Sequence, residues 1–596
     1  MMSLSGCDLS RVSNSTSQSG FALQGRVRGG QQPVSGASIH LYAAGSAGDG
    51  AGAVDLLAPN VVTTDALGNF NITGDYVCPT AGTQVYLVAR GGNPGLGPGE
   101  NNPALAMMTA LGNCGGLSGA TNIVVDEVTT VASAWALAQF MSGGAIAGST
   151  ATNATGLDNA FAVVNNLVDT SMGTAPGPSL PSGAVTEQAK LYALANAIAP
   201  CINSDGGAAC SALFAAAATA QGAPANTLDA ALNIVEHPGS NVAAVFNAGA
   251  AQGPFQPALS SAPNDWTMSI TYGRCSAACG GLNLPGSLAI DSGGDVWVAN
   301  YFGGVVSKFS PTGVPAAASG IAGVGLNESY GIAIDGSDNV WVTNEQSVTG
   351  ANNHHYGSVS EFSSAGAELS GFGYTGGGVY YPLAAAGDLN GDIWIADYGS
   401  SSATLLAGNG SAISGSGGYG ASALPFPTAV AIDASHNAWF AVEAAAVRVT
   451  PAGAVSSFPC CNDPAGIAVD AYGDVWIADY NASAIVELTS AGSVAQRTTL
   501  LGGDGGPQGI AIDGAGHVWA ANYFGNSLVE LASSTAGVLS PAQGYGLDAP
   551  LSEPYGLAID ASGGVWLSNA QADTLTQFVG LASPVKTPLL GPPVQP

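Results

Sequence analysis

The stretch PAGIAVDAYGDVWIAD, residues 464–479, decides the fold of the C-terminal half because it recurs there seven times in similar form. Each copy contains one tryptophan, and successive tryptophans lie between 37 residues (439 to 476) and 53 residues (341 to 394) apart. That interval is close to the length of one four-stranded propeller blade. The seven residues are Trp297, Trp341, Trp394, Trp439, Trp476, Trp519 and Trp566.

The same residue types recur at fixed distances before each tryptophan. Alanine stands eight residues before it and aspartate six before it in all seven copies, while proline stands twelve before it in six copies. An alanine flanked by aliphatic residues indicates an inner strand buried on both faces. An aspartate followed by a glycine-containing turn indicates a tight hairpin, with the carboxylate bonding the backbone of the turn. We therefore predict a seven-bladed β-propeller over residues 282–582, in which the aspartates cap turns and form no metal ring.

The first half of the chain predicts two more domains. Residues 21–122 predict a small β-sandwich, because apolar residues alternate with polar ones at Ala37, Ile39 and Leu41 and a turn at residues 65–68 precedes a further strand. Residues 123–250 are rich in alanine and have helical periodicity, with Asp126 as an N-cap. The fold class is thus multidomain and mainly β, with an N-terminal β-sandwich, an Ala-rich α-helical middle domain and a C-terminal propeller. The remaining segments are predicted to be a tether, a linker and a C-terminal tail, over residues 1–20, 251–281 and 583–596.

Composition excludes several classes of partner. Charged residues make up 8% of the chain, and the net charge is -30. Nucleic acids and anionic membranes require basic patches, so neither is expected as a partner. No apolar run reaches the roughly 18 residues that a transmembrane helix needs.

The nine cysteines indicate an oxidising compartment. Eight of them form local pairs without the spacing of a zinc site, so disulfides are the better explanation, although the sequence does not prove the connectivity. The candidates are Cys78, Cys114, Cys201, Cys210, Cys275, Cys279, Cys460 and Cys461. The ninth, Cys7, ends the run Leu-Ser-Gly-Cys, which resembles the lipobox of bacterial lipoproteins. Cys7 is therefore the lipidation candidate, and it implies a lipid anchor to the membrane. No basic or apolar segment precedes it, so whether the true start lies upstream of Met1 stays open.

Two segments resemble known families. The run GRVRGGQQPVSGASIHLYAAG, followed by VTTDALGNFNIT, is similar to the carboxypeptidase regulatory-like (transthyretin-like) β-sandwich, which implies a spacer or adhesion unit without catalytic residues. The propeller pattern resembles NHL repeats and, more closely, the streptogramin (virginiamycin B) lyases. That resemblance implies a histidine after the first-strand proline, a second histidine, nearby glutamates and a magnesium ion, which together eliminate across an ester-linked lactone.

The histidine pattern of the lyases is missing here. The residues after the first-strand proline position, eleven before each tryptophan, are Gly286, Tyr330, Leu383, Thr428, Ala465, Gln508 and Tyr555. The histidines of this half are His354 and His355 in an insertion of the second blade, and His436 and His517 in turns opposite the usual site. We therefore do not transfer the activity, and we expect no catalytic residue, no metal and no cofactor.

The remaining candidates lie where first strands begin and second strands end, because these positions share one end of a propeller. Tyrosines interleaved with amides and carboxylates suit a polyhydroxylated ligand, which needs a stacking surface and paired hydrogen-bonding groups. The alternative is that the Asn and Asp side chains cap strand ends while the tyrosines pack on neighbouring blades. The candidates are Asn300, Tyr301, Tyr330, Asn344, Asp397, Tyr398, Asp479, Tyr480, Gln508, Asn522, Tyr523, Tyr555 and Asn569.

These observations predict a bacterial protein that is secreted or anchored at the cell surface. Its propeller is expected to bind an extracellular glycan, peptide or protein without catalysis, as a binding or adhesion protein. Two alternatives remain open: a streptogramin lyase-like or lactonase-like enzyme, and a structural component of an extracellular matrix or filament. The sequence leaves the identity of the ligand and the oligomeric state undetermined.

Overall fold

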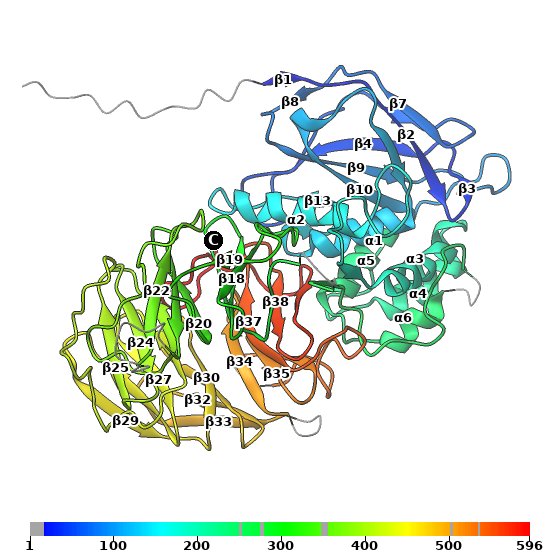
Figure 1. Ribbon diagram of the computed structural model, residues 1–596. Helices are drawn as coiled ribbons and strands as arrows, with labels where there is room; N and C mark the ends of the chain where they lie inside the picture. Colours follow the sequence, from blue (N-terminus) through cyan, green and yellow to red (C-terminus); the bar gives the residue numbers. More distant parts are fainter. Residues whose placement is uncertain (1–16, 250–252, 275–278, 347–355, 501–504, 534–536) are drawn as a thin grey trace, which may run out of the picture.

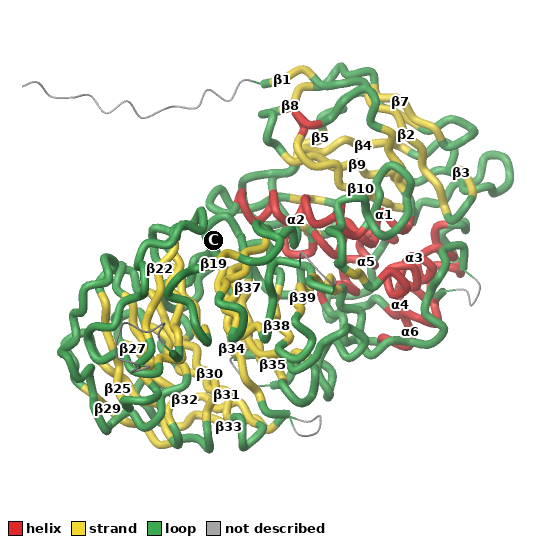
Figure 2. Tube along the Cα trace, in the orientation of Figure 1, coloured by secondary structure: helices red, strands yellow, loops and turns green. Residues whose placement is uncertain are grey.

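The computed structural model describes residues 17–249, 253–274, 279–346, 356–500, 505–533 and 537–596. Figure 1 shows a sandwich, a group of helices and a propeller, which confirms the predicted multidomain, mainly β fold class. Figure 2 shows that α1, α2 and α5 lie between the two β-rich parts. Four residues discussed above, Cys7, Cys275, His354 and His355, lie outside the described residues.

The N-terminal part is a sandwich of two mainly antiparallel sheets. One sheet has the order β10-β9-β4-β5, with β6 paired to β4. The other joins β11, β2 and β3, with β7 paired to β2, and its strand β11 runs parallel to β2. Alternating burial along β2 and β7 produces the core between the sheets. The strands are β1 (Gln18–Ser19), β2 (Leu23–Gly29), β3 (Gln32–Pro33), β4 (Ser38–Ala43), β5 (Val54–Asp55), β6 (Val62–Thr63), β7 (Asn69–Ile72), β8 (Val77–Cys78), β9 (Gln84–Arg90), β10 (Ala106–Asn113) and β11 (Asn122–Val125).

Six helices form the middle part. Asp126 caps α1 as expected, because its side chain accepts a hydrogen bond from the backbone of Thr129 at 2.9 Å. None of the helices in the described part of the chain has the length and apolar character needed to cross a bilayer. The elements are α1 (Glu127–Ala136), α2 (Ala154–Leu167), α3 (Gln188–Ile202), α4 (Ala208–Ala216), α5 (Thr227–Glu236) and α6 (Val242–Ala248), with the short η2 (Ala138–Phe140), β12 (Met141–Ser142), β13 (Ile146–Ala147) and β14 (Val185–Thr186). The short helix η1 (Cys114–Gly116) belongs to the sandwich, between β10 and β11.

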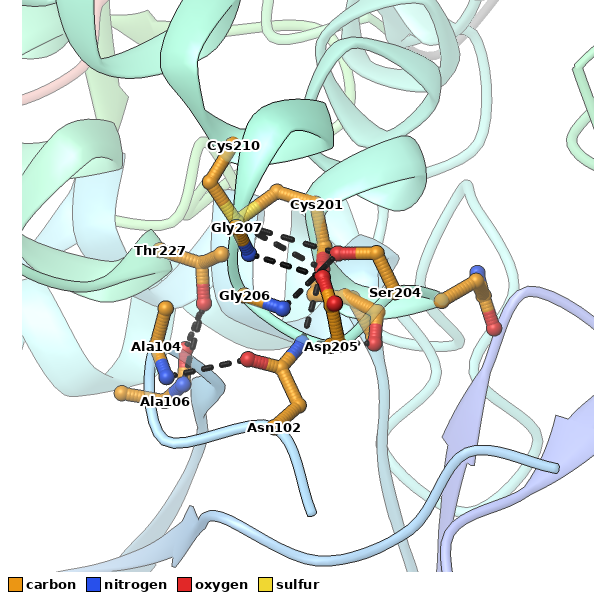
Figure 3. The surroundings of a disulfide bond; sticks show 12 residues. Asn102, Ala104, Ala106, Cys201, Ser204, Asp205, Gly206, Gly207, Cys210 and Thr227 are labelled. Atoms are coloured by element: carbon orange, nitrogen blue, oxygen red, sulfur yellow. Dashed lines mark hydrogen bonds between the residues drawn. A yellow bond between two sulfur atoms is a disulfide. The ribbon is translucent and has the colours of Figure 1, made fainter. Parts of the chain in front are cut away.

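Among the described residues, three disulfides join the predicted pairs Cys78–Cys114, Cys201–Cys210 and Cys460–Cys461. Figure 3 shows that the second of them links the end of α3 to α4. There the Asn102 amide, from the sandwich, donates to the carbonyls of Cys201 at 2.7 Å and Ile202 at 3.0 Å. Carbonyls at a helix end have no partner within the helix, so Asn102 satisfies them and ties the sandwich to the helices.

The propeller has seven blades. The inner strand begins twelve residues before the tryptophan in six of them and ten residues before it in blade four. The strands of blades one to three are β16 (Pro285–Ile290), β17 (Val296–Asn300), β18 (Val305–Phe309), β19 (Ile321–Ala322), β20 (Ser329–Ile334), β21 (Val340–Asn344), β22 (Ser358–Phe362), β23 (Pro382–Gly387), β24 (Ile393–Asp397) and β25 (Ser402–Leu406). Blades four and five contain β26 (Ala429–Ile432), β27 (Ala438–Val442), β28 (Ala445–Val449), β29 (Val455–Pro459), β30 (Pro464–Val469), β31 (Val475–Asp479), β32 (Ala484–Leu488) and β33 (Val494–Thr499). Blades six and seven contain β34 (Pro507–Ile512), β35 (Val518–Asn522), β36 (Ser527–Leu531), β37 (Pro554–Ile559), β38 (Val565–Asn569) and β39 (Thr574–Phe578).

The aspartate and tryptophan of each repeat are scaffold residues. In every blade one carboxylate oxygen accepts the backbone N–H groups two and four residues ahead, which closes the turn. In six blades the other oxygen accepts the indole N–H of the buried tryptophan, at 2.7 to 3.1 Å. Blade three is the exception, because the buried Nε1 of Trp394 has no partner among the residues that the structure describes. The aspartates therefore cap the turns, as predicted.

One boundary needs correction. Part of the expected linker 251–281 is a strand, β15 (Ser269–Tyr272), which pairs with β39 and is followed outward by β14. The C-terminal chain supplies only three strands to blade seven, so the fourth comes from the segment before blade one. This pairing closes the ring and covers the edge that an open sheet would expose.

The helices contact the end of the propeller where the aspartate turns lie. Asn153 and Asn159 of this layer donate to the carbonyls of Ala561 at 2.9 Å and Gly293 at 3.2 Å, in the turns of blades seven and one. The C-terminal segment lies at the same end: Thr587 Oγ1 donates to the carbonyl of Asp291 at 2.8 Å, and the C-terminus lies beside the helical layer (Figure 1). The opposite end, where the inner strands begin, carries the candidate site.

Candidate functional site

The end of the propeller at which the seven inner strands begin is called the rim, and the opening of the central channel there is called the mouth. The mouth is a cavity of about 180 Å³. Its lining includes the residues eleven positions before the tryptophans in six of the seven blades: Tyr330, Leu383, Thr428, Ala465, Gln508 and Tyr555. The aromatic and amide groups lie on blades two, six and seven, so one side of the mouth is polar and aromatic and the other is small or aliphatic.

Two tyrosines meet across one side of the mouth. The hydroxyl of Tyr555 donates to that of Tyr330 at 2.6 Å, and their rings stand edge to face with centroids 5.7 Å apart. They belong to blades seven and two, and blade one between them carries Gly286 at the same position. A glycine there leaves room for the two rings. Burial raises the pKa of Tyr330 and, more strongly, that of Tyr555, so both phenols are protonated at neutral pH.

The residue that precedes each inner strand, directly in six blades and by three positions in blade four, has an unusual backbone. All seven, thirteen positions before the tryptophans, have φ between 46° and 65°. This left-handed region is costly for any residue with a side chain, and such strain in a non-glycine residue favours a functional hypothesis. The residues are Leu284, Glu328, Tyr381, Phe426, Asp463, Gly506 and Glu553.

Tyrosines at the ends of second strands bridge blade junctions by contacting these left-handed residues. The hydroxyl of Tyr301, in blade one, donates to the carboxylates of Glu328 at 3.3 Å and Glu345 at 3.2 Å, both in blade two. Tyr523, in blade six, donates to Glu553 of blade seven at 2.6 Å. Burial first, and then the adjacent carboxylates, raise the pKa of both phenols, so these tyrosines are also hydrogen-bond donors rather than bases.

Two further tyrosines of the rim pack against phenylalanines. Tyr398 and Phe426 have ring centroids 5.2 Å apart, and Tyr480 and Phe524 lie 5.7 Å apart. The rings of Phe426 and Phe524 are 48% and 54% exposed, so their free faces are available to a ligand. The rim therefore presents aromatic faces around most of its circumference.

The six Asn and Asp candidates are buried within the blades and do not face the mouth as ligand contacts would. All are buried, and in five of them a side-chain oxygen accepts the backbone N–H seventeen residues earlier. Their other side-chain atoms bond inside the blade, as in Asn569, whose amide donates to the hydroxyls of Thr574 and Thr576. These side chains hold strand ends together, and the structure does not bring them to the mouth. They are Asn300, Asn344, Asp397, Asp479, Asn522 and Asn569.

Asp479 and Asp397 show how such burial is tolerated. Asp479 forms an ion pair with Arg497 Nη1 at 2.6 Å, and Arg497 also donates to the carbonyl of Cys460 beside the disulfide Cys460–Cys461. Asp397 lacks such a cation, and burial raises its pKa well above the usual value. Its side chain accepts from the hydroxyl of Thr404 at 2.7 Å.

Sequence reasoning missed two carboxylates of the rim. Glu328 and Glu553 contact rim tyrosines, yet neither was predicted, whereas Glu345 follows Asn344 at a strand end that the sequence places on the rim. The signal that could have found them is positional, because Glu328 and Glu553 occupy the same place, thirteen residues before the tryptophan. This position was overlooked because its residue type varies between blades, while its backbone conformation does not.

The histidines of the described propeller lie in the aspartate turns, away from the mouth. His517 Nδ1 lies 2.8 Å from Glu530, and His436 Nδ1 lies 3.6 Å from Asp388. Within the described ranges, no group of three or more His, Cys, Asp or Glu side chains is arranged to hold a metal ion.

Comparison with known proteins gives one family. Residues 281–578 match the family described as the virginiamycin B lyase family. No curated protein matches the chain. Among solved structures, virginiamycin B lyase from Staphylococcus aureus is 15% identical, with a TM-score of 0.41, over 52% of this chain and 97% of that one. The extracellular domain of a putative hybrid two-component system from B. thetaiotaomicron is 16% identical, with a TM-score of 0.41, over 53% of this chain and 42% of that one. Similarities of this size say nothing of the ligand.

Proposed function

The chain belongs to the virginiamycin B lyase family through residues 281–578, and from this premise we propose that its propeller is a non-catalytic binding module. Its rim and mouth hold an extracellular ligand, for which a glycan is the best-fitting class. The sandwich and the helices act as a stalk, because they are attached at the opposite end of the propeller.

The observation that carries this proposal is the gathering of tyrosines at one end of the propeller. Aromatic faces stack on the apolar face of a sugar ring, while phenol hydroxyls and carboxylates supply donors and acceptors for its hydroxyl groups. Tyr330 and Tyr555 stand at the mouth beside Gln508, and the contacts of Tyr301 and Tyr523 with glutamates lie on the same rim. Neutral phenols and acceptor carboxylates match a ligand rich in hydroxyl groups better than one rich in acidic groups.

The protonated state of the rim tyrosines argues against the lyase reaction. Elimination needs a general base whose pKa lies near the working pH. The positions after the first-strand proline contain no histidine. Burial moves the pKa of Tyr301, Tyr330, Tyr523 and Tyr555 upward, and neighbouring carboxylates raise those of Tyr301 and Tyr523 further. This is the wrong direction for a base.

The cysteines support the proposed location at the cell surface or outside the cell. Disulfides persist in oxidising compartments and are rare in the cytosol. Three of them among the described residues favour a protein that is secreted or held at the cell surface, with Cys7 as the proposed point of lipid attachment.

A glycan array with three tyrosine variants tests the binding role. We expect the wild-type protein to bind a subset of glycans, and Tyr301→Ala and Tyr523→Ala to lose at least tenfold in affinity for them. Tyr472→Ala is the matched control, because Tyr472 is 84% exposed in an aspartate turn at the other end of the propeller. Equal losses in all three variants would contradict a rim site. An array without hits, together with self-assembly of the protein in solution, would instead support a component of an extracellular matrix or filament.

Family membership favours a second candidate function, an enzyme of the lyase or lactonase type. Magnesium-dependent loss of a streptogramin in the presence of the purified protein would support it and overturn the non-catalytic proposal. We expect the streptogramin to remain intact.

A further inference from the structure

A second cavity continues the central channel below the mouth. It measures about 230 Å³ and is lined by all seven inner strands. Seven lining residues are shared with the mouth, one from each inner strand, and all stand nine positions before a tryptophan. Six of them are branched aliphatic residues, Leu288, Ile332 and Ile510 among them, and the seventh is Ala385. The two cavities therefore form one channel that joins at an aliphatic collar.

The C-terminal segment closes this channel at the far end. Val585, Thr587 and Leu589 line the lower cavity, and Gly591 and Pro593 lie beside them. Hydrogen bonds fix the segment to two blades: Thr587 Oγ1 donates to the carbonyl of Asp291 at 2.8 Å, and the backbone N–H of Val585 donates to the carbonyl of Asp560 at 3.2 Å. The predicted C-terminal tail, 583–596, is thus the floor of a blind channel that opens at the mouth.

We propose that this blind channel is a binding site for the unbranched apolar part of a neutral amphipathic ligand, whose polar part stays at the mouth. This inference rests on the proposed function, because it assigns a chemical class to the ligand of the same end of the propeller. The side chains that line the lower cavity are aliphatic apart from Thr587. Cavities with apolar linings take up apolar molecules, and burial of each methylene from water favours binding.

The shape and charge of the channel define the ligand further. Six residues of an inner strand extend roughly 20 Å, so the channel is long and suits a linear chain. The carboxylates of Glu328, Glu345 and Glu553 lie on the rim, and the chain carries a net charge of -30. Both disfavour a carboxylate head group, so a fatty acid is a poor match. The hydroxyls of Tyr330 and Tyr555 at the mouth offer hydrogen bonds to a neutral hydroxyl.

Calorimetric titration of the full chain with 1-butanol, 1-hexanol and 1-octanol tests the proposal. Each added methylene is expected to tighten binding by up to about fourfold, since about 0.8 kcal/mol per methylene corresponds to that factor. We expect octanol to bind at least tenfold more tightly than butanol, with a negative heat-capacity change, and octanoate to bind at least tenfold more weakly than octanol. Affinity that does not depend on chain length, or no binding of any alcohol, would mean that the channel holds only water and would overturn the proposal.

Variants that fill the channel locate the binding. Ala511→Leu and Ala386→Leu add volume to the cavity lining in blades six and three, and each is expected to lower octanol affinity at least tenfold. Ala452→Leu, at an exposed turn, is the matched control and should leave it unchanged. A melting temperature within a few degrees of wild type shows that a variant is folded, and two variants on different blades keep the test decisive if one does not fold. Unchanged octanol affinity in the folded filling variants would refute the proposal.

The two proposals fail in different ways. Glycan binding that depends on Tyr301 and Tyr523, without chain-length-dependent alcohol binding, would refute the channel site and leave the rim site standing. Alcohol binding in the channel without any glycan hit would refute the rim proposal alone.

Discussion

Removing one oxygen acceptor from a scaffold aspartate should destabilise the propeller in a blade-specific way. Asp470 accepts the backbone N–H groups of Tyr472 and Asp474 at 2.9 Å with Oδ1, and the indole N–H of Trp476 at 3.1 Å with Oδ2. In the variant Asp470→Asn, one oxygen can still close the turn. The side-chain NH₂ then faces the indole N–H, so a buried donor loses its acceptor.

The size of the effect follows from that lost bond. A buried donor left without a partner costs about 1–3 kcal/mol, and a hydrogen bond to a charged group contributes about 1.5–3 kcal/mol. We therefore expect Asp470→Asn to lower the free energy of unfolding by about 2 kcal/mol. The chain offers a matched control, Asp388→Asn in blade three. Asp388 makes the same two turn bonds, but Trp394 donates no indole bond to it. Its Oδ2 instead lies 3.3 Å from the side-chain amide of Asn390 and 3.6 Å from His436 Nδ1, neither of which is buried, so the control should lose about 1 kcal/mol less.

Scanning calorimetry measures the difference. Unfolding entropy of roughly 2.1 cal/mol/K per residue gives a 300-residue propeller about 0.6 kcal/mol/K, so 2 kcal/mol corresponds to a shift of about 3 °C in melting temperature. We expect that shift for Asp470→Asn and a clearly smaller one for Asp388→Asn. Equal shifts in the two variants, or no shift for Asp470→Asn, would refute the assignment of the aspartate–indole bond as a stabilising element.

Three further predictions concern the rest of the scaffold. Lys190→Met should lower the free energy of unfolding by about 3–5 kcal/mol, because it leaves the buried carboxylate of Glu187, 2.6 Å from Nζ, without its cation. In urea unfolding, the double variant with Glu187→Gln should recover part of this loss. No recovery would contradict a stabilising role of the ion pair. Glu127 is buried with Oε2 unpaired, and burial raises its pKa from 4.5 to about 8. Between these values the folded state holds a proton that the unfolded state has released, so the free energy of unfolding should fall as pH rises from 5 to 8. In Glu127→Gln this free energy should fall less over the same range. Parallel curves of stability against pH for the two proteins would contradict this. Loop closure predicts that removal of Cys78–Cys114, whose cysteines are 36 residues apart, lowers the free energy of unfolding by about 4 kcal/mol. Removal of Cys201–Cys210, with a separation of 9, should lower it by about 2.5 kcal/mol, and urea midpoints in the reverse order would refute this.

The sequence predicts the propeller because its scaffold chemistry is local. The aspartate that closes a turn and the tryptophan that it contacts lie six residues apart, so the pattern is visible in every copy. The closing strand β15 is not visible in this way. It has four residues, all buried, no tryptophan, and a partner some 300 residues further along the chain. The floor of the channel was missed for a related reason, since a segment rich in proline and glycine has the composition of a free tail.

The candidate site was predicted in part. The tyrosines Tyr330 and Tyr555 lie at the mouth because their position in the repeat fixes where they lie. The amides and carboxylates beside them could not be assigned from the sequence, because a ligand contact and a strand-end hydrogen bond use the same residue types at the same positions. Burial separates the two roles, and burial depends on tertiary packing. The left-handed conformation of Glu328 and Glu553 is likewise a property of the assembled blades.

Binding of an array-selected glycan to a double variant at the mouth tests the central claim most directly. Tyr330→Ala with Tyr555→Ala removes both phenols that meet there at 2.6 Å, and Tyr472→Ala changes a tyrosine at the opposite end. Calorimetric titration should show binding reduced at least a hundredfold in the double variant and unchanged in Tyr472→Ala. Full affinity in the folded double variant would contradict a ligand site at the rim and mouth of the propeller.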